Sequence, residues 1–405
     1  MQTTPLKYLV SYNDEVLPEK TDPDYEFDYI EIGSVEYGKG ITSTERMTYG
    51  KAPSRARRIV KKGDVIISTV RTYLKAVAYI NDSHDEQIAS TGFAVLRPIN
   101  IYDRFLYYSV LSDDFIQKVE ANSVGISYPA ITATKLMTFK IPTLPLYEQQ
   151  AIATYLDDRC SKIDAIIAEA KASIEEYKEL KQAVIYEAVT KGLDKKVEMK
   201  DSGVEWIGEI PGYWTLKRFK YVARIKSNLV DPNEYMEYYQ IAPDCIEKDS
   251  GTISTNRLVK DAGVISGNHL FHKGQILYSK IRPVLNKVAI APYDGLCSAD
   301  MYPLDAIEDT KFVAISMQAK YFVSQVELIT RDRVKMPKIN QEELGNIFMP
   351  IPPRDIQYKI VEYINKKNKQ LDSLISEKQS LIEDLEAYKK SLIYEVVTGK
   401  RKVVA

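Results

Sequence analysis

The sequence predicts an α+β protein in which two similar mixed α/β domains are each followed by a long helix. An internal repeat, two long stretches with helical periodicity, and short β-branched runs between them support this prediction. A shift of 208 positions places 145–190 on 353–398 without a gap. Fifteen of these 46 pairs are identical, where average composition would give roughly three by chance. We therefore predict the order domain, helix, domain, helix.

The two domains are predicted over 1–144 and 199–352. Their repeat is visible in Lys62-Gly63-Asp64, which resembles Lys273-Gly274-Gln275, and in Arg71, which matches Arg282. Short apolar runs bounded by Gly and by Arg or Pro are typical of strands. We expect such strands at 64–70 and 275–278. Short helices are expected after them, at 103–120 and 309–327.

The long helices are predicted over 145–198 and 353–405, and Pro145 and Pro353 suit their starts. In both stretches apolar residues recur every three or four positions, with occasional irregular steps, and charged residues occupy the other face of the helix. A run of about 45 residues spans roughly 65 Å. Helices that pack on their own domains are the alternative, but a domain of this size cannot bury so long a helix. We predict an antiparallel coiled coil with a pseudo-two-fold relation between the halves. Its seam is expected at Leu156, Ile163, Ile167, Ile174, Leu371, Leu374, Leu385 and Leu392.

Composition narrows the class of protein. The chain has 405 residues, 45% apolar and 27% charged, with a net charge of −1, which is ordinary for a folded globular protein. The neutral total excludes a protein that is basic throughout, although it allows local basic faces. There is no run of 18 apolar residues and no secretory leader, so we expect no membrane contact. Three cysteines without a CxxC motif indicate a reducing compartment, so a cytoplasmic protein is expected.

Catalytic motifs are missing from the sequence. It contains no Walker A string, no Asn/Asp-Pro-Pro-aromatic methyltransferase motif and no glycine-rich nucleotide loop. His269 and His272 could bind a metal, but a solvated loop pair is the favoured interpretation. Asp244 and Asp309 are at best fragments of a nuclease motif. We therefore expect no catalytic residue, no metal site and no cofactor in this chain, which would not be an enzyme by itself.

Locally concentrated basic residues favour binding to nucleic acid. Six basic residues and no acidic one lie in 51–62, and five basic residues with no acidic one lie in 217–226. Such clusters can neutralise phosphates, although each could also be a solvated face. The DNA-binding candidates in and beside these clusters, and in a third one near 331–338, are Arg55, Arg57, Arg58, Lys61, Lys226, Asn228, Arg331, Arg333 and Lys335.

The loops after the repeated strands are sharper candidates. Residues 71–75 and 282–287 occupy equivalent places but differ in side chains. Arginine can pair with guanine and asparagine with adenine, although Arg71 and Arg282 could equally brace the turn. Two domains with a shared frame and different loops should read two short sequences, separated by about one to two DNA turns of ~34–36 Å each. The candidates here are Arg71, Thr72, Tyr73, Lys75, Tyr128, Lys280, Arg282, Asn286 and Lys287.

Two strings carry a family resemblance. Ile207-Gly208-Glu209-Ile210-Pro211-Gly212-Tyr213-Trp214 resembles the start of a target recognition domain, and the stretch 145–152, Pro-Leu-Tyr-Glu-Gln-Gln-Ala-Ile, resembles the start of a conserved helix. Together with the repeat, the chain resembles a type I restriction–modification specificity subunit over essentially its whole length. The first domain departs from the pattern because it lacks the Ile-Pro-x-x-Trp string. The second helix keeps only Gln357 of the glutamine pair.

The resemblance implies a bipartite double-stranded DNA target, with one half-site read by each recognition domain. It also implies two DNA adenine methyltransferase (M) subunits and restriction/motor (R) subunits as partners. S-adenosylmethionine, ATP and Mg²⁺ would belong to those partners. A DNA-binding coiled-coil adaptor without restriction partners is the alternative. Two further alternatives are a self-sufficient DNA enzyme and an adaptor that does not bind DNA. Salt-dependent DNA binding would exclude the adaptor that does not bind DNA.

Overall fold

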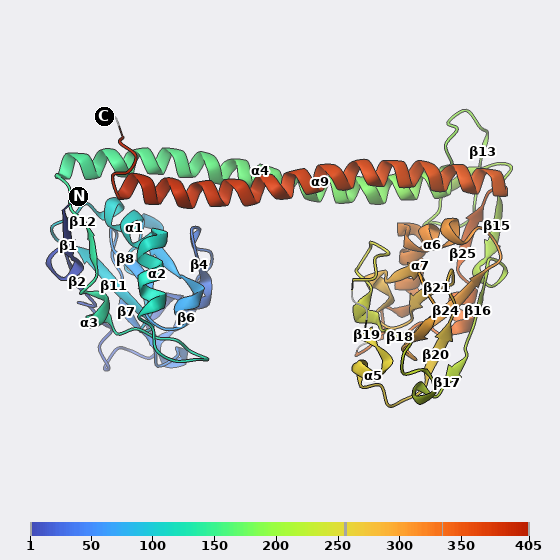
Figure 1. Ribbon diagram of the computed structural model, residues 1–405, viewed down its shortest axis with the longest axis horizontal. Helices are drawn as coiled ribbons and strands as arrows, with labels where there is room; N and C mark the ends of the chain where they lie inside the picture. The colour runs from blue at the N-terminus through green and yellow to red at the C-terminus, as the bar shows by residue number, and fades with distance from the viewer. Residues whose placement is uncertain (1, 255–256, 334, 404–405) are drawn as a thin grey trace. The chain divides into compact units, whose positions relative to one another are not determined.

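The computed structural model describes residues 2–254, 257–333 and 335–403, and the chain divides into two compact units. Unit 1 combines Met1–Lys171 with Gln379–Ala405, and unit 2 is Ala172–Lys378. Each unit contains one mixed α/β domain and a part of both long helices, whose ribbons are continuous in Figure 1. The predicted fold class is therefore confirmed. No helix in the described part of the chain has the length and apolarity needed to cross a lipid bilayer.

Two four-stranded sheets form the domain of unit 1. One has the antiparallel order β2-β11-β8-β9, and the other has the order β6-β3-β10-β7 with β3 and β10 parallel. The predicted strand at 64–70 is β8, whose residues are all buried because both faces of this central strand are covered. The strands of unit 1 are β1 (Thr3–Pro5), β2 (Val10–Tyr12), β3 (Glu26–Ile30), β4 (Val35–Glu36), β5 (Gly40–Ile41), β6 (Glu45–Thr48), β7 (Ala56–Ile59), β8 (Val65–Ser68), β9 (Val77–Tyr79), β10 (Ile88–Ser90), β11 (Phe93–Pro98) and β12 (Lys140–Pro142).

Unit 2 repeats this arrangement. Its sheet β16-β24-β21-β22 corresponds to β2-β11-β8-β9, and its five-stranded sheet β17-β20-β23-β18-β19 again contains one parallel pair, β18 with β23. The predicted strand at 275–278 is β21. The strands of unit 2 are β13 (Met199–Asp201), β14 (Glu209–Pro211), β15 (Thr215–Arg218), β16 (Ala223–Ile225), β17 (Leu229–Val230), β18 (Tyr239–Ile241), β19 (Arg257–Leu258), β20 (Asn268–Phe271), β21 (Ile276–Ser279), β22 (Val288–Ile290), β23 (Gly295–Cys297), β24 (Met301–Ala306) and β25 (Phe348–Ile351).

The two predicted short helices, at 103–120 and 309–327, are present, but each is divided in two. The backbone is extended at Ser112 and at Ala319, which ends one helix and starts the next at the same place in both repeats. The short helices are α1 (Asp103–Leu111), α2 (Asp113–Ala121), α3 (Ala133–Leu136), α5 (Val259–Ala262), α6 (Thr310–Gln318), α7 (Lys320–Thr330) and α8 (Gln341–Gly345).

The long helices are α4 (Leu146–Lys191) and α9 (Arg354–Val397), and a buried glutamine in the first turn fixes the start of each. The Gln149 side chain accepts a hydrogen bond from the backbone N–H of Tyr102 (2.8 Å) and donates one to the carbonyl of Leu144 (2.8 Å). Gln357 makes the same pair of bonds with Asp309 (3.0 Å) and Pro352 (2.9 Å). Each amide thus joins a long helix to the start of α1 or α6.

Within each unit the segments of α4 and α9 pair through buried apolar residues and ion pairs. Lys389 contacts Asp164 in unit 1 and Lys181 contacts Asp372 in unit 2, both at 2.6 Å. These two pairs are equivalent under the 208-residue repeat. The predicted seam residues that are buried are Leu156, Ile163, Ile167, Ile174, Leu371 and Leu392.

Two predicted seam residues are less buried than the others. Leu374 is 39% exposed and lines, together with the seam residue Leu371, a groove between the two helices, and Leu385 is only half-buried. Ile382, which was not predicted, is buried. The apolar positions of a straight helix drift around its axis relative to a strict seven-residue repeat, so a spacing rule applied along 44 residues does not select the most buried position at every turn.

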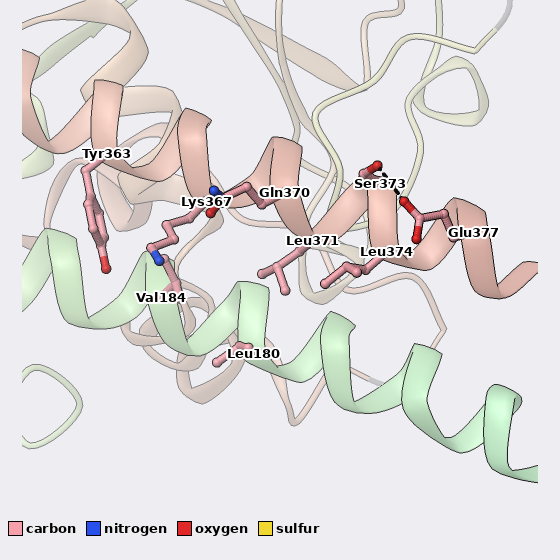
Figure 2. Close-up of a pocket in the computed structure, with 9 residues that line it drawn as sticks. All are labelled: Leu180, Val184, Tyr363, Lys367, Gln370, Leu371, Ser373, Leu374 and Glu377. Carbon is pink, nitrogen blue, oxygen red and sulfur yellow. Dashed lines mark hydrogen bonds between the residues drawn. The ribbon is translucent and has the colours of Figure 1, made fainter.

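A groove of about 590 Å³ lies on the helix pair of unit 2. Figure 2 shows Leu180 and Val184 from α4 opposite Leu371 and Leu374 from α9. Tyr363 also lines the groove. Leu180 is 47% exposed, so the helix pair presents apolar surface here.

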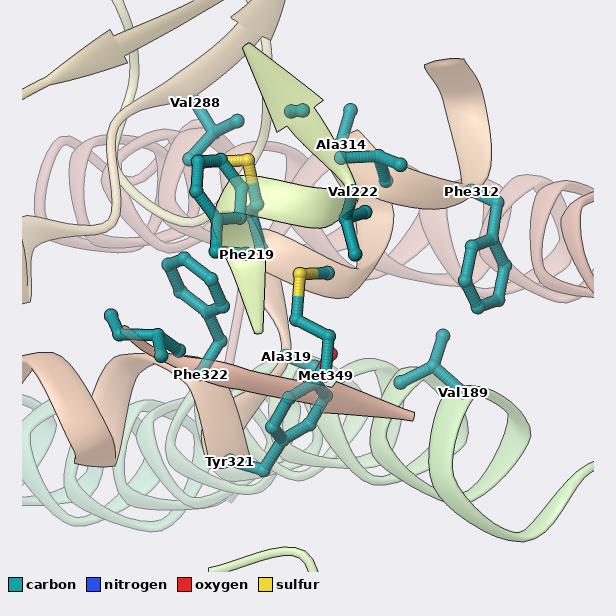
Figure 3. Close-up of a cluster of buried hydrophobic side chains, with 14 of the residues drawn as sticks. Val189, Phe219, Val222, Val288, Phe312, Ala314, Ala319, Tyr321, Phe322 and Met349 are labelled. Carbon is teal, nitrogen blue, oxygen red and sulfur yellow. The ribbon is translucent and has the colours of Figure 1, made fainter. Parts of the chain in front are cut away.

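The main core of unit 2 lies where both long helices meet the domain. Figure 3 shows Phe219, Phe312 and Phe322 in this cluster, together with Val189 from α4. Ile360 and Ile364 from α9 join the same cluster. The helices of unit 2 therefore pack on their domain as well as on each other.

Candidate nucleic-acid interface

In unit 1, two loops that are distant in sequence lie side by side. The first is the turn after β8, residues 69–75, and the second is residues 122–131. Ile131 donates its backbone N–H to the carbonyl of Thr69 (2.8 Å), and Val70 bridges Ala130. Backbone bonds therefore bring together five predicted DNA-binding residues, namely Arg71, Thr72, Tyr73, Lys75 and Tyr128.

Unit 2 contains the same loop pair, formed by residues 280–287 and 331–339. Ile339 donates to the carbonyl of Lys280 (2.9 Å), and Ile281 bridges Lys338. The scaffold is thus repeated while the side chains differ. The predicted residues that these two loops contribute are Lys280, Arg282, Asn286, Lys287, Arg331, Arg333 and Lys335.

Both loops contain arginine in the left-handed backbone region. Arg71 has φ 52° and Arg282 has φ 43°, and each precedes a short 3₁₀ turn, η4 (Thr72–Leu74) or η9 (Pro283–Leu285). This conformation costs an L-residue about 1–2 kcal/mol, whereas glycine adopts it freely. The same strained backbone position is therefore occupied by arginine in both repeats. The Arg71 guanidinium lies over the Tyr128 ring, 5.2 Å from its centroid.

Two predicted DNA-binding residues are structural instead. Thr72 is 3% exposed and donates its hydroxyl to Ser123 Oγ (2.8 Å). Asn286 is 2% exposed, and its amide donates to Asp249 Oδ1 (3.0 Å) and to the carbonyl of Gln318 (2.9 Å). Both side chains are buried and donate hydrogen bonds within the protein, so neither is exposed to a base edge; the buried Oδ1 atom of Asn286 has no hydrogen-bond partner among the described residues. Lys287 also donates to a backbone carbonyl, that of Pro243.

The other predicted cations lie at or near the surface beside acidic or aromatic neighbours. In unit 1, Arg55 pairs with Glu31 and Lys61 with Glu15, whereas Arg57 lies over the Tyr49 ring. Arg58 is partly buried, and this burial lowers the pKa of its guanidinium. These residues belong to β7 and its flanks, in a different sheet from the Arg71 turn.

In unit 2, Arg333 pairs with Glu343, and this contact lowers the pKa of the Glu343 carboxyl. Lys226 pairs with Asp305 (3.2 Å), and Lys280 lies over the Tyr302 ring. Asn228 and Lys335 are exposed. Exposed ion pairs contribute little free energy, so these lysines and arginines could exchange a carboxylate for a phosphate at small cost.

The histidine pair is not a solvated loop pair. His269 is buried in β20, and burial lowers the pKa of its imidazole. His272 is exposed and lies 3.4 Å from Asp294. Among the residues that the structure describes, no group of three or more His, Cys, Asp and Glu side chains could hold a metal ion.

Sequence reasoning missed the apolar part of the 122–131 loop. Val124 and Ile126 are strongly exposed beside Tyr128, which was the only residue predicted there. The signal was the turn string Gly125-Ile126-Ser127, because an apolar residue inside a polar turn has no core to enter.

The repeated loop pair agrees with what the comparisons find. The family model described as the type I restriction modification DNA specificity domain matches residues 13–176 and 219–384, once in each repeat. The chain belongs to this family.

Members of this family include the specificity subunit of the type I restriction enzyme EcoDI from Escherichia coli. It is 32% identical over 287 residues, which cover 67% of this chain and 64% of that protein, so the match spans less than two thirds of the relative's length. The MjaVIII specificity subunit from Methanocaldococcus jannaschii is 26% identical over 74% of this chain and 71% of its own length.

Solved structures share the fold of this family member. A chain from a study of complex assembly and conformational transition of the type I R-M system has a TM-score of 0.76 at 21% identity, covering 98% of this chain and 97% of that one. The HsdS subunit from Thermoanaerobacter tengcongensis has a TM-score of 0.53 at 21% identity, covering 99% and 97%.

Proposed function

We propose that this chain is the DNA specificity subunit of a type I restriction–modification complex, and that each of its two domains reads one half of a bipartite double-stranded target. The observation that carries the proposal is the repeated loop pair. The same backbone bonds hold both copies, and the exposed side chains on them differ. A shared frame with different side chains is what two readers of two different sequences require.

In this proposal the chain supplies specificity and its partners supply catalysis. Two adenine methyltransferase subunits transfer methyl groups from S-adenosylmethionine, and restriction subunits use ATP and Mg²⁺. The two relatives named above are specificity subunits, which supports this role.

The test is to co-express the chain with the methyltransferase encoded beside it and to map methylated adenines in the host genome. We expect a split motif with a gap of fixed length. A contiguous motif would contradict the two-reader proposal. DNA binding without any methyltransferase partner would favour a DNA-binding adaptor instead.

The helix groove of unit 2 is the surface that we propose for a partner subunit. Leu180 and Leu374 are exposed there, and apolar surface concentrated in a groove is typical of a protein interface. Leu374→Asp should abolish co-purification with the methyltransferase, because it places a charge in an apolar contact. Leu328→Asp is the matched control, since Leu328 is similarly exposed on α7 outside the groove. Equal co-purification of both variants would place the partner elsewhere.

A further inference from the structure

The loop of residues 124–130 in unit 1 exposes three apolar or aromatic side chains at alternate positions. Val124 is 81% exposed, Ile126 is 102% exposed and Tyr128 is 66% exposed. A single exposed apolar residue needs no explanation, but three in one short loop form an exposed apolar patch, which is typical of a contact site. This surface adjoins the Arg71 turn, so it belongs to the part of unit 1 that we propose as its DNA reader.

The loop is closed by its own backbone. Val124 and Ala130 exchange both of their N–H···O bonds, at 2.9 and 3.0 Å, as the residues at the base of a β-hairpin do. Gly125 has φ 115°, and a Cβ atom there would lie 3.1 Å from the carbonyl oxygen of Tyr128. Only glycine fits this position without strain. The apolar side chains are therefore presented by a loop with a defined shape.

The equivalent loop of unit 2 adds charge to the same frame. Pro337 matches Pro129 in the repeat, and the loop is anchored by the corresponding backbone bonds. Met336, which matches Tyr128, is 52% exposed, and the described side chains beside it include Arg331, Arg333 and Lys335. Residues 122–131 of unit 1 contain no charged residue, so the loop of unit 1 is wholly uncharged whereas that of unit 2 combines an apolar side chain with cations.

We infer that the 124–130 loop reads thymine through its 5-methyl group in the major groove, whereas the loop of unit 2 adds contacts made through charge. The inference rests on the proposed function and deepens it. The major groove admits a two-stranded ribbon, while the minor groove is about half as wide. Thymine alone presents an apolar group on its major-groove edge. Arg71, stacked on Tyr128, places a positive charge beside this loop for a neighbouring phosphate.

The test uses the full chain in complex with its methyltransferase and a duplex that carries the mapped target. Each thymine is replaced in turn by deoxyuridine, which removes only the methyl group, and affinity is measured by fluorescence anisotropy. At one or more positions of a single half-site, the wild-type complex should bind roughly fourfold more weakly, the equivalent of one buried methyl group. Ile126→Ser should be insensitive to the same replacement, and Ile126→Val should keep the wild-type pattern.

Salt dependence provides the matched control. Ile126→Ser should leave the slope of log affinity against log salt concentration unchanged, because the lost contact carries no charge. Lys335→Ser should reduce that slope by about one and should keep the deoxyuridine effect. These two variants separate apolar readout from charge contact within the same scaffold.

Several results would overturn the inference while leaving the proposed function intact. One is that the wild-type complex binds every deoxyuridine duplex as tightly as the thymine duplex. Another is that the Ile126→Ser complex still binds the deoxyuridine duplex more weakly than the thymine duplex. Unstacking detected by 2-aminopurine fluorescence at the same step, without a methyl effect, would indicate an intercalating wedge and would also overturn it. If the wild-type complex binds no split target, the proposed function fails, and this inference fails with it.

Discussion

At the scale of single residues, equivalent positions in the two repeats do different work. In unit 1, Asp64 is buried and accepts two hydrogen bonds from Arg97, at 2.9 and 2.8 Å. The equivalent pair in unit 2 is Gln275 with Asp305, joined by one hydrogen bond of 2.6 Å. The repeat predicted that these positions correspond, but no sequence pattern indicated that Arg97 would reach Asp64. Contacts between distant residues depend on the packed sheet and not on local spacing.

Asp64→Ala should lower the free energy of unfolding of unit 1 by about 2–4 kcal/mol, because it leaves Arg97 without its bidentate partner in a partly buried site. Gln275→Ala should cost unit 2 only about 1 kcal/mol, since a single hydrogen bond is lost. Thermal unfolding can be followed separately in the two units. Alkylation of Cys160 reports on unit 1, and the fluorescence of Trp206 and Trp214 reports on unit 2. Equal losses in the two variants would mean that the Asp64 carboxylate is effectively solvated.

At the scale of elements, the sequence predicted the helices well and their contacts less well. The starts of α4 and α9 lie within one residue of the predicted positions, because proline marks them. The seam was predicted only in part, since Leu374 and Leu385 are partly exposed and Ile382, which was not predicted, is buried. The ion pairs between the helices could not be predicted, because they require the two helices to be placed against each other first.

Lys389 and Lys171 make a matched pair of tests for the helix contact in unit 1. The Lys389 side chain is 12% exposed, and its ammonium contacts both Asp164 and the carbonyl of Gly38. Lys171 and Glu386 are each 51% exposed and 3.8 Å apart. Lys389→Met should destabilise unit 1 by about 1–3 kcal/mol, whereas Lys171→Met should change its stability by less than about 0.5 kcal/mol. Denaturant unfolding followed by Cys160 alkylation measures both variants. A negligible effect of Lys389→Met would show that this pair is screened by solvent.

At the scale of the whole molecule, the boundaries between the compact units run through the long helices. The sequence predicted domains and helices as successive segments, and that order is present. The predicted antiparallel pairing places the end of the second helix beside the start of the first, but it did not give the boundary at 379, because a repeat reveals similarity between segments and not where one compact unit ends. The same limit applies to the candidate interface. The contact between the 122–131 loop and the Arg71 turn depends on the assembled sheet, so the sequence did not predict it.

Deletion of residues 379–405 should destabilise unit 1 and spare unit 2. Burial raises the pKa of Cys160 to about 11, so its thiol is both shielded and protonated in the folded unit. Without 379–405 we expect rapid alkylation of Cys160, because α4 loses the helix segment that carries Lys389, a neighbour of Cys160. The tryptophan fluorescence transition of unit 2 should stay in place. A shift of that transition with slow Cys160 labelling would contradict this division of the chain.

Unit 1 is built from two segments that are far apart in the sequence, and this sets the order in which the units can fold during synthesis on the ribosome. Residues 172–378 form a unit from one continuous segment, whereas the first 171 residues must wait for 379–405. At about 5–20 residues per second, synthesis of the intervening segment takes on the order of 10–40 s. During that time the apolar face of the emerging α4 has no α9 segment to cover it. The domain that is translated first is therefore the one that can finish folding last, and it is the one most exposed to chaperones and proteases.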